Sequence, residues 1–363
     1  MLPPAGGERR PAVGRPVIFV GPLPPPAHGQ AVSTSGLADR LAAAGLALAV
    51  FNVNGPSGPL GFLRRALRHA SALPRILAGP DGALYLSLNA NAGMALTALL
   101  AAAGRLRRRP VVIHHHTYGH IARPRRLMAL LAAAAGSRAL HLTICPAMSA
   151  ALGAAYPAVR RTGALSNVGI VADDLLALQR PVRAGPPVLG HMSNLTETKG
   201  IGRVVETFRA ARKAGLAARL VVAGPFAEPF ARTMVEAAAA EFGPDFDYRG
   251  PVYGPGKAQF FADIDVFLFP SLYDNETQGI VNLEALAAGV PVLAHGLCCI
   301  PGDVGGSGGL VVPPDADFAE AAGVWLARWN PAGGAAAMAR HRFRALLASH
   351  AGEVDALVAE LAG

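Results

Sequence analysis

The sequence predicts an α/β protein built from two doubly wound domains, and three observations support this prediction. The chain has 363 residues, which is enough for two domains that each bury a core. Short apolar segments alternate with helical segments along most of the chain, as in parallel sheets joined by crossover helices. Residues 173–187, which are rich in Pro and Arg, divide this pattern and predict a linker.

The first domain is predicted to cover residues 16–172, after a disordered tail at residues 1–15. The last helix is expected at about 334–361, and its residues from about 340 to 363 are expected to cross back onto this domain. The predicted strands are 16–20, 46–53, 83–87, 110–114, 140–144 and 163–165, and the predicted helices are 31–44, 60–77, 91–103, 126–135 and one from Pro146.

The second domain is predicted to cover residues 188–339. Its expected helices begin or end at capping and breaking residues, such as Gly289 and Pro291 after the helix 278–288. The predicted strands are 188–192, 219–223, 246–249, 266–269, 290–294 and 310–312, and the other predicted helices are 201–214, 229–242 and 315–325.

The charge is shared unevenly between the two halves. Residues 1–172 hold 18 Arg against Glu8, Asp39 and Asp81, a balance of +15, whereas the remainder holds 15 Lys and Arg against 21 acids, a balance of −6. The Arg clusters at 64–68, 105–109 and 123–126 lack the interleaved aromatics of single-strand binders, which argues against nucleic acid. The favoured partner is an anionic membrane surface, and plain solvated arginines are the alternative.

Several features favour a cytoplasmic protein that is peripheral on the inner face of the cell membrane. The first 15 residues have no apolar core of a signal peptide, and no run reaches the roughly 18 apolar residues of a membrane span. Cys145, Cys298 and Cys299 predict neither a disulfide framework nor a metal site, which fits a reducing compartment.

The rest of the chain is organised around residues 267–295, which form a strand, a polar loop, a helix and a second strand. Ligands of open parallel sheets bind beyond the carboxyl ends of the strands, where this loop lies. Gly279 allows a ligand to approach the backbone, and the free N–H groups of the following helix favour a phosphate. Glu276 and Glu284 are eight positions apart, about 12 Å along a helix, which suits two ends of one elongated ligand.

This segment resembles family-4 retaining glycosyltransferases of the GT-B fold. The resemblance rests on Glu276 and Glu284 with seven residues between them, followed by Ala-Leu-Ala-Ala-Gly-Val-Pro-Val. It covers nearly the whole chain, strongly from 188 to 312 and weakly from 16 to 165. It implies two Rossmann-like domains that face a central cleft. It also implies transfer of a sugar, with retention, from a nucleoside-diphosphate sugar such as a UDP- or GDP-sugar. No Asp-x-Asp motif stands at the end of a predicted strand, which predicts that the reaction is metal-independent. No cofactor is implied.

The resemblance also implies roles for residues of the second domain. Glu276 would hold the sugar hydroxyls, Glu284 the ribose hydroxyls and Lys199 the diphosphate. Asn194 stands where many members of the family have an arginine, and Gly302 stands where they have a glutamate. The complete implied donor site is Asn194, Lys199, Gly224, Val252, Glu276, Thr277, Gln278, Gly279, Ile280 and Glu284.

In the first domain, a histidine at the end of the strand 110–114 is implied to lie beside the donor sugar and the acceptor. His116 is the first choice, which makes His116, Glu276 and Lys199 the implied catalytic residues. Because strand residues alternate faces, His114 shares the face of His116, and the three adjacent histidines cannot converge on one metal ion. Histidines that only hydrogen-bond the loop backbone are the alternative.

His28, Gly29 and His114 are the implied acceptor-side residues. His28 and Gly29 lie in a Pro-rich loop that resembles the first loop of GT-B enzymes, and a rigid connector is the alternative. The basic first domain predicts a lipid-linked or saccharide acceptor in surface polysaccharide biosynthesis.

Other functions remain open at this point. A non-catalytic nucleotide-binding or partner subunit fits the departures at Asn194, Gly302 and Cys298. A sugar-nucleotide 2-epimerase shares the fold. A glycosidase is disfavoured because its acid pair would need a separation of about 5–9.5 Å.

Overall fold

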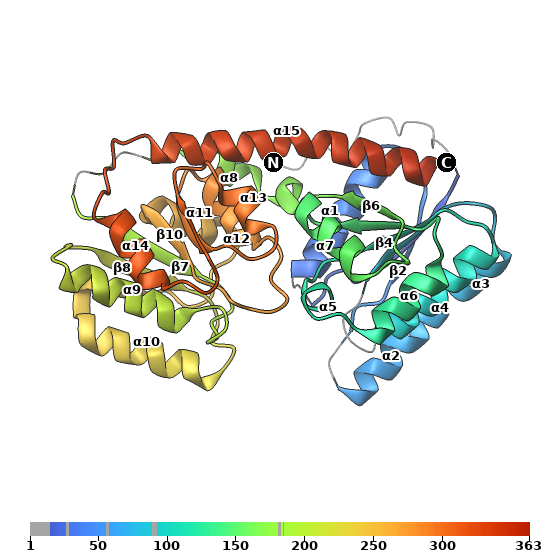
Figure 1. Cartoon of the computed structure of the whole chain (residues 1–363), viewed down its shortest axis with the longest axis horizontal. Coiled ribbons are helices and arrows are strands. Elements are labelled where there is room, and N and C mark those ends of the chain that lie inside the picture. Colours follow the sequence, from blue (N-terminus) through green and yellow to red (C-terminus); the bar gives the residue numbers. More distant parts are fainter. Residues whose placement is uncertain (1–14, 27–28, 56–57, 89–92, 181–182, 184) are drawn as a thin grey trace. The chain divides into compact units, whose positions relative to one another are not determined.

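The computed structural model describes residues 15–26, 29–55, 58–88, 93–180, 183 and 185–363. The chain divides into unit 1, Met1–Ser166 with His350–Gly363, and unit 2, Asn167–Ser349. Each unit has one six-stranded sheet in which all paired neighbours run parallel (Figure 1). The predicted α/β class with two doubly wound sheets is confirmed.

Unit 1 has the strand order β2-β1-β3-β4-β5-β6. Its buried core includes Phe19 and Tyr85, whose rings stack at 4.4 Å between neighbouring strands. The elements are β1 Val17–Gly21, α1 Gly29–Ala43, β2 Leu48–Asn52, α2 Pro59–Ala70, α3 Leu73–Ala78, β3 Leu84–Ser87, α4 Gly93–Leu106, β4 Val111–His114, α5 Gly119–Ala122, α6 Arg126–Ala135, β5 Leu140–Thr143, α7 Pro146–Ala155 and β6 Arg161–Ala164.

Unit 2 has the strand order β12-β11-β10-β7-β8-β9. Its strands are β7 Val188–Met192, β8 Arg219–Ala223, β9 Phe246–Tyr248, β10 Val266–Phe269, β11 Val292–His295 and β12 Leu310–Val312. The helices are η1 Asn167–Ile170, α8 Asp173–Ala177, α9 Ile201–Lys213, α10 Pro229–Phe242, η2 Gly243–Asp245, α11 Pro255–Asp263, α12 Ile280–Ala287, α13 Ile300–Val304, α14 Phe318–Leu326 and α15 Ala335–Ala362.

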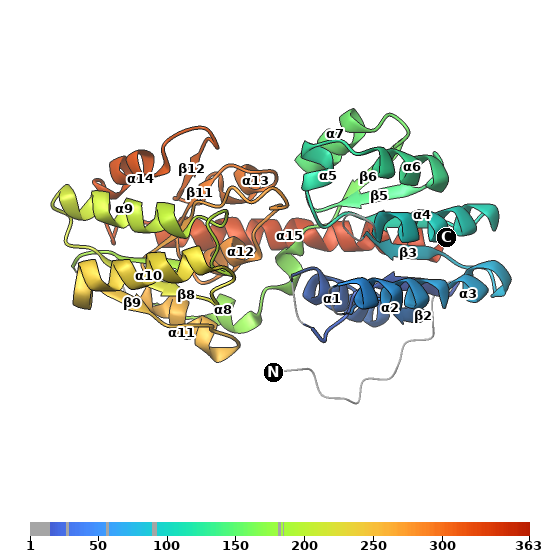
Figure 2. The same ribbon diagram turned by 90° about the horizontal axis from the view of Figure 1, so that it is seen from below.

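The unit 2 sheet is buried on both faces, which explains why its central strand β10 is apolar at every position. In β10, Val266 and Leu268 enter a core formed with α9, α10 and α14, whereas Phe267 and Phe269 enter a second core formed with α11, α12 and α15. These helices surround the unit 2 strands in Figure 2. Because helices cover both faces of the sheet, polar loops are found at the carboxyl ends of its strands.

Helix α15 has residues in both units, 335–349 in unit 2 and 350–362 in unit 1. In unit 2, the Arg340 guanidinium donates to backbone carbonyls of Leu176, Leu178 and Ala288. In unit 1, Glu360 forms an ion pair with Arg161 at 2.7 Å. The helix is therefore fixed to each unit by its own set of polar contacts.

Several parts of the chain differ from the predicted elements. Residues 60–77 form two helices, α2 and α3, because Pro74 lies in the first turn of α3 and cannot continue α2. The predicted linker 173–187 begins with α8, whose Leu175 is buried in the unit 2 core. Helices α5, α11 and α13 were not predicted, and α11 and α13 each have a Pro in their first turn.

No helix in the described ranges combines the length and the apolar character that crossing a membrane requires.

Candidate functional site

The loops after β7 and β10 lie side by side at the carboxyl ends of the unit 2 sheet. The two strands are paired neighbours, and the Leu272 N–H donates to the Thr198 carbonyl at 2.9 Å. Gly200, the residue before α9, has φ +92°, and a Cβ there would lie 2.4 Å from the Pro270 carbonyl oxygen. Only glycine therefore permits the two loops to approach this closely.

Lys199 and Glu276 form an ion pair between these loops. Lys199 Nζ lies 2.6 Å from Glu276 Oε2, and the Glu276 side chain is only 9% exposed. Ser271 donates its hydroxyl to the same oxygen at 3.1 Å, and Lys199 Nζ lies 4.8 Å from the centre of the Tyr273 ring. Within the described residues both contacts of this carboxylate fall on Oε2, so Oε1 is left to accept from a ligand.

Glu284 forms a second ion pair, with Lys257 of α11. Lys257 Nζ lies 2.7 Å from Glu284 Oε1, while Glu284 Oε2 is buried and has no partner in the described structure. Burial raises the pKa of the Glu284 carboxyl, the Lys257 charge opposes this shift, and the nearby Asp174 reinforces it. The Glu284 carboxylate thus resembles that of Glu276: a lysine binds one oxygen, and the other oxygen has no hydrogen bond within the described residues.

The first residues of α12 combine backbone constraint and buried polar groups. Gly279 precedes the helix at φ +61°, where a Cβ would lie 2.9 Å from the Phe269 ring. The helix begins at Ile280, two residues later than predicted, because the left-handed backbone of Gly279 cannot be part of an α-helix. The buried Gln278 side chain accepts at 2.9 Å from the backbone N–H of Asn167. The Thr277 carbonyl accepts from Cys299 at 3.0 Å. These hydrogen bonds and the tight packing of Gly279 fix the position of the start of α12.

Gly224 and Val252 lie in the loops after β8 and β9. Gly224 has φ +128°, and a Cβ there would lie 1.7 Å from the Ser193 carbonyl oxygen. Its N–H donates to the Gly250 carbonyl at 2.8 Å, which joins the two loops. Val252 packs its side chain against the unit 2 core, so its main chain is the part that is free to face a ligand.

Asn194 has an exposed side chain in the loop after β7. The neighbouring Leu195 is buried, and its N–H donates to the Pro225 carbonyl at 2.9 Å. Inside the strand, His191 bonds to the Leu268 carbonyl and to the Ser193 hydroxyl at 2.9 Å each, and burial lowers its pKa to about 4. His191 is thus a neutral structural group, and Asn194 faces solvent.

The histidines of unit 1 separate by strand face, as alternation predicts. The rings of His114 and His116 are in contact, with centroids 4.0 Å apart. His114 Nδ1 and the buried Tyr85 hydroxyl share a hydrogen bond of 2.7 Å. Burial lowers the pKa of His116 to about 3 and that of His114 well below its usual value. Nε2 of each is buried without a partner among the described atoms. Both rings are therefore neutral at pH 7.

His115 lies on the opposite face, in a chain of three imidazoles. Its Nδ1 lies 2.9 Å from His120 Nε2, and its Nε2 lies 3.0 Å from His141 Nδ1. Burial lowers the pKa of His120 and of His141 to about 4. Both ring nitrogens of His115 are used in these hydrogen bonds. His115 therefore has no nitrogen left to bind a metal ion together with His120 and His141.

The predicted acceptor-side loop is only partly described. His28 lies outside the described residues. Gly29 is the first residue of α1, and the adjacent Gln30 donates to the Ser87 hydroxyl at 3.0 Å and to the Leu88 carbonyl at 2.9 Å. These bonds attach the start of α1 to the end of β3.

Sequence reasoning missed Lys257, Ser271 and Tyr273 as neighbours of the two glutamates. Lys257 is one of only three lysines in the chain, which could have drawn attention to it. Its helix was not predicted, so nothing in the pattern placed it beside Glu284. Cys298 has φ +48°, and burial raises the pKa of its thiol to about 12, which makes it unsuited to act as a nucleophile.

Residues 186–328 match the family model described as Glycosyl transferases group 1. The chain carries a glycosyl transferases group 1 domain. The match includes both Lys–Glu pairs and every residue of the implied donor site, so this part of the chain is a glycosyltransferase domain. No curated protein matches the chain significantly in sequence.

Solved glycosyltransferase structures share the fold of the whole chain. HepE from Anabaena, in complex with UDP-glucose, superposes with a TM-score of 0.65 at 18% identity, over 95% of this chain and 98% of its own. Sucrose-phosphate synthase from Thermosynechococcus elongatus gives 0.69 at 19%, over 96% and 99%. WaaG, a glycosyltransferase involved in lipopolysaccharide biosynthesis, gives 0.65 at 17%, over 96% and 100%. The fold is therefore GT-B, and the group 1 domain is its second half.

Proposed function

We propose that this protein is a retaining glycosyltransferase that moves a sugar from a nucleoside-diphosphate sugar to an acceptor hydroxyl. One observation carries the proposal: Glu276 and Glu284, at the carboxyl ends of the sheet in the group 1 domain, each have one oxygen held by a lysine and one left to accept. Two such carboxylates suit the hydroxyl groups at the two ends of a nucleotide sugar. A UDP-sugar is the first donor to test because the similar HepE structure holds UDP-glucose.

The proposed chemistry uses charge that is fixed before the donor arrives. As the sugar–phosphate bond breaks, negative charge develops on the leaving diphosphate, and Lys199 with the N–H groups at the start of α12 would stabilise it. Glu276 Oε1 would accept from the sugar hydroxyls and Glu284 Oε2 from the ribose. The Asn194 amide would add one neutral hydrogen bond. No side chain is assigned as a covalent nucleophile.

The unit 1 residues are proposed to serve the acceptor. His116 is assigned to the reacting centre, with His114, Gly29 and His28 on the acceptor side. A neutral His116 would accept or donate one hydrogen bond without adding positive charge beside an oxocarbenium-like centre. Residues 16–172 are proposed as the acceptor-side domain and residues 188–339 as the donor domain.

Release of UDP from a UDP-sugar, with and without saccharide acceptors, tests the transfer. Lys199→Met and Glu276→Gln should each lower turnover by roughly 10²-fold or more, in line with the loss of one preorganised transition-state contact. Arg232→Ala, which removes an exposed cation of α10, is the matched control and should retain activity. Turnover without any acceptor would favour an epimerase or a hydrolase. Nucleotide binding without turnover would favour a non-catalytic subunit.

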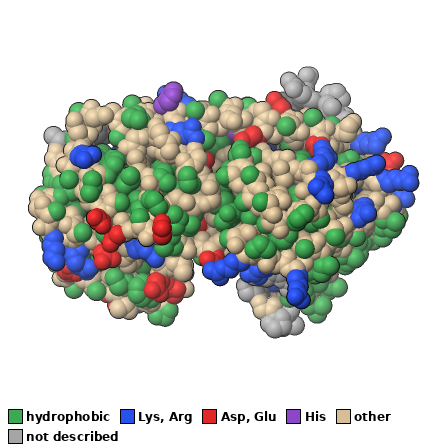
Figure 3. All heavy atoms as spheres, viewed as in Figure 1, with side chains coloured by type: hydrophobic (Ala, Val, Ile, Leu, Met, Phe, Trp, Pro, Cys, Tyr) green, Lys and Arg blue, Asp and Glu red, His purple; other side chains and the backbone are tan. Residues whose placement is uncertain are grey.

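The proposed acceptor is lipid-linked, and unit 1 is proposed to dock on an anionic membrane in the cytoplasm. Leu63 and Leu67, one turn apart on α2, are 56% and 62% exposed. Leu99 and Leu106 of the adjacent α4 are 53% and 76% exposed. Arginines flank both pairs, and Figure 3 shows Lys and Arg side chains gathered over unit 1 among hydrophobic ones. Exposed leucines among cations are typical of an interfacial surface.

Sedimentation with vesicles tests the docking surface. The protein should bind vesicles of phosphatidylglycerol at low salt, bind them less at high salt and ignore phosphatidylcholine. Leu63→Glu with Leu67→Glu should reduce binding at least tenfold, whereas Tyr253→Glu, at an exposed aromatic of unit 2, should leave it unchanged. Equal binding by both variants would refute the assignment of α2.

A further inference from the structure

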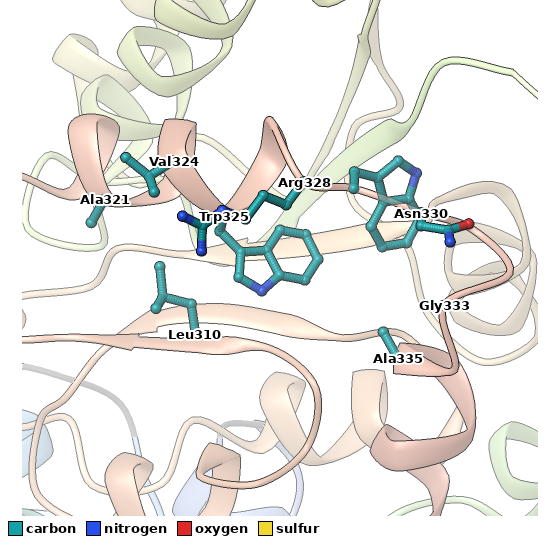
Figure 4. A pocket seen from close by; sticks show the side chains of 9 residues that line it. Leu310, Ala321, Val324, Trp325, Arg328, Asn330, Gly333 and Ala335 are labelled. Carbon is teal, nitrogen blue, oxygen red and sulfur yellow. The ribbon is translucent and has the colours of Figure 1, made fainter.

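A hollow of about 330 Å³ opens beside the edge strand β12 of unit 2 (Figure 4). Leu310 forms its floor at the first residue of β12, and Trp325, Arg328 and Asn330 line it from the end of α14 and the segment that follows. The volume is at the lower end of the about 300–1,000 Å³ that small-molecule sites occupy.

The hollow contains both tryptophans of the protein. Trp325 and Trp329 have ring centroids 5.5 Å apart, with an angle of 38° between the rings. Both pack one side against the core and keep the remainder partly exposed. A protein with only 6% aromatic residues thus concentrates its two largest apolar rings in one partly open place.

Hydrogen-bond donors surround these rings. The Arg328 guanidinium, the Asn330 amide N–H₂ and both indole N–H groups have no protein acceptor within the described structure. No carboxylate is among the residues that line the hollow. A saccharide fits this combination, because its C–H face can lie on an aromatic ring while its hydroxyl groups accept from the surrounding donors. A lipid chain would leave these donors without acceptors.

The hollow is separate from the donor site within unit 2. All paired strands of the sheet are parallel, and the Lys199–Glu276 pair joins the loops at the carboxyl ends of β7 and β10. The Lys257–Glu284 pair joins α11 and α12, the helices that follow β9 and β10. Leu310 is instead the first residue of the edge strand β12, at its amino end. Trp325 lies at the carboxyl end of α14, the helix that follows β12 and runs back towards that end. A ligand in the hollow would leave the donor loops free.

We propose that this hollow is a second saccharide site, which binds a sugar unit of the acceptor glycan or the glycan product. Trp325 and Trp329 supply the stacking surface, and Arg328 with Asn330 supplies the polar contacts. Arg328 gives the site a preference for sugars that carry a carboxylate. That the bound sugar belongs to the acceptor or product glycan rests on the proposed function. That the hollow binds a saccharide does not.

Intrinsic fluorescence of the full chain tests this proposal, because its only tryptophans line the hollow. Titration with maltotriose, N-acetylglucosamine and glucuronic acid should give a saturable change with at least one of them. Glycerol at equal concentration, a polyol without a ring, should give none. Arg328→Ala and Asn330→Ala keep both reporters and should each weaken binding roughly two- to tenfold, the effect of one lost hydrogen bond. The matched control Arg232→Ala should bind normally.

Other results would overturn the proposal. These are an absent or non-saturable change with every saccharide, or a change that Arg328→Ala and Asn330→Ala both leave intact. A response to phosphatidylglycerol vesicles but not to saccharides would assign the hollow to lipid. Glu284→Ala separates this test from that of the donor site: it should lose UDP binding and keep the saccharide response. Loss of both responses in the folded variant would contradict two separate sites.

Discussion

Acid should destabilise unit 1 through its buried imidazole chain. His120 and His141 are 3% and 1% exposed, and burial lowers the pKa of each to about 4 from an ordinary 6.5. Below pH 6.5 the unfolded chain binds a proton at each ring that the folded chain does not bind. Stability should therefore fall as the pH falls from 6.5 towards 4.

The magnitude follows from the size of the pKa shift. At pH 5 each ring lies about 1.5 pH units below its unfolded pKa, and one unit corresponds to about 1.4 kcal/mol, so each costs about 2 kcal/mol. The two together cost about 4 kcal/mol, a large part of the 5–15 kcal/mol typical of a folded domain. His115, whose pKa is also lowered by burial, acts in the same direction.

Urea denaturation followed by far-UV circular dichroism at pH 7.5 and pH 5 measures this difference. His120→Gln and His141→Asn place an amide where Nε2 and Nδ1 bond to His115, without a group that titrates. The double variant should lose about 4 kcal/mol of the difference between the two pH values, and the buried His114, His115 and His116 should keep the remainder. His341→Asn, at an exposed position of α15, should keep it. Equal pH dependence in the double variant and the wild type would refute the reasoning.

Two further predictions concern unit 2. Lys257→Ala removes the charge that opposes the raised pKa of Glu284, so UDP binding should be lost at a higher pH on acidification than in the wild type, as calorimetry between pH 7.5 and 5 would show. Gly224→Ala should destabilise unit 2 by about 3 kcal/mol or more in urea denaturation, because its Cβ would overlap the Ser193 carbonyl at a strained φ. Gly256→Ala, whose Cβ would lie 3.7 Å from its nearest neighbour, should cost less than 1 kcal/mol, about the range of a tolerated substitution.

The sheet of unit 2 could be predicted almost residue by residue, because its strands are short apolar runs between polar loops. β7, β8, β10 and β12 begin and end where the sequence predicts. The same holds for α10, which begins at Pro229 and ends before Gly243. Alternation along β4 also correctly placed His114 and His116 on one face.

Contacts between distant segments could not be predicted in this way. Lys257 reaches Glu284 across 27 positions from a helix with little apolar periodicity, which the pattern did not reveal. The three-imidazole chain joins His115 to rings 5 and 26 residues away, and no local pattern encodes such pairing. The break between α2 and α3 was missed although Pro74 marks it, because the apolar and basic faces continue through residues 60–77.

Calorimetric titration of the folded protein with UDP, GDP and ADP tests the proposed donor site most directly. One nucleotide should bind, and Glu284→Ala should weaken its binding at least tenfold, because the ribose hydroxyls would lose the free carboxylate oxygen. Glu236→Ala removes an exposed acid of α10 and should bind as the wild type does. Binding of none of the three nucleotides, or equal affinity in Glu284→Ala, would contradict the assignment of this site to a nucleotide sugar.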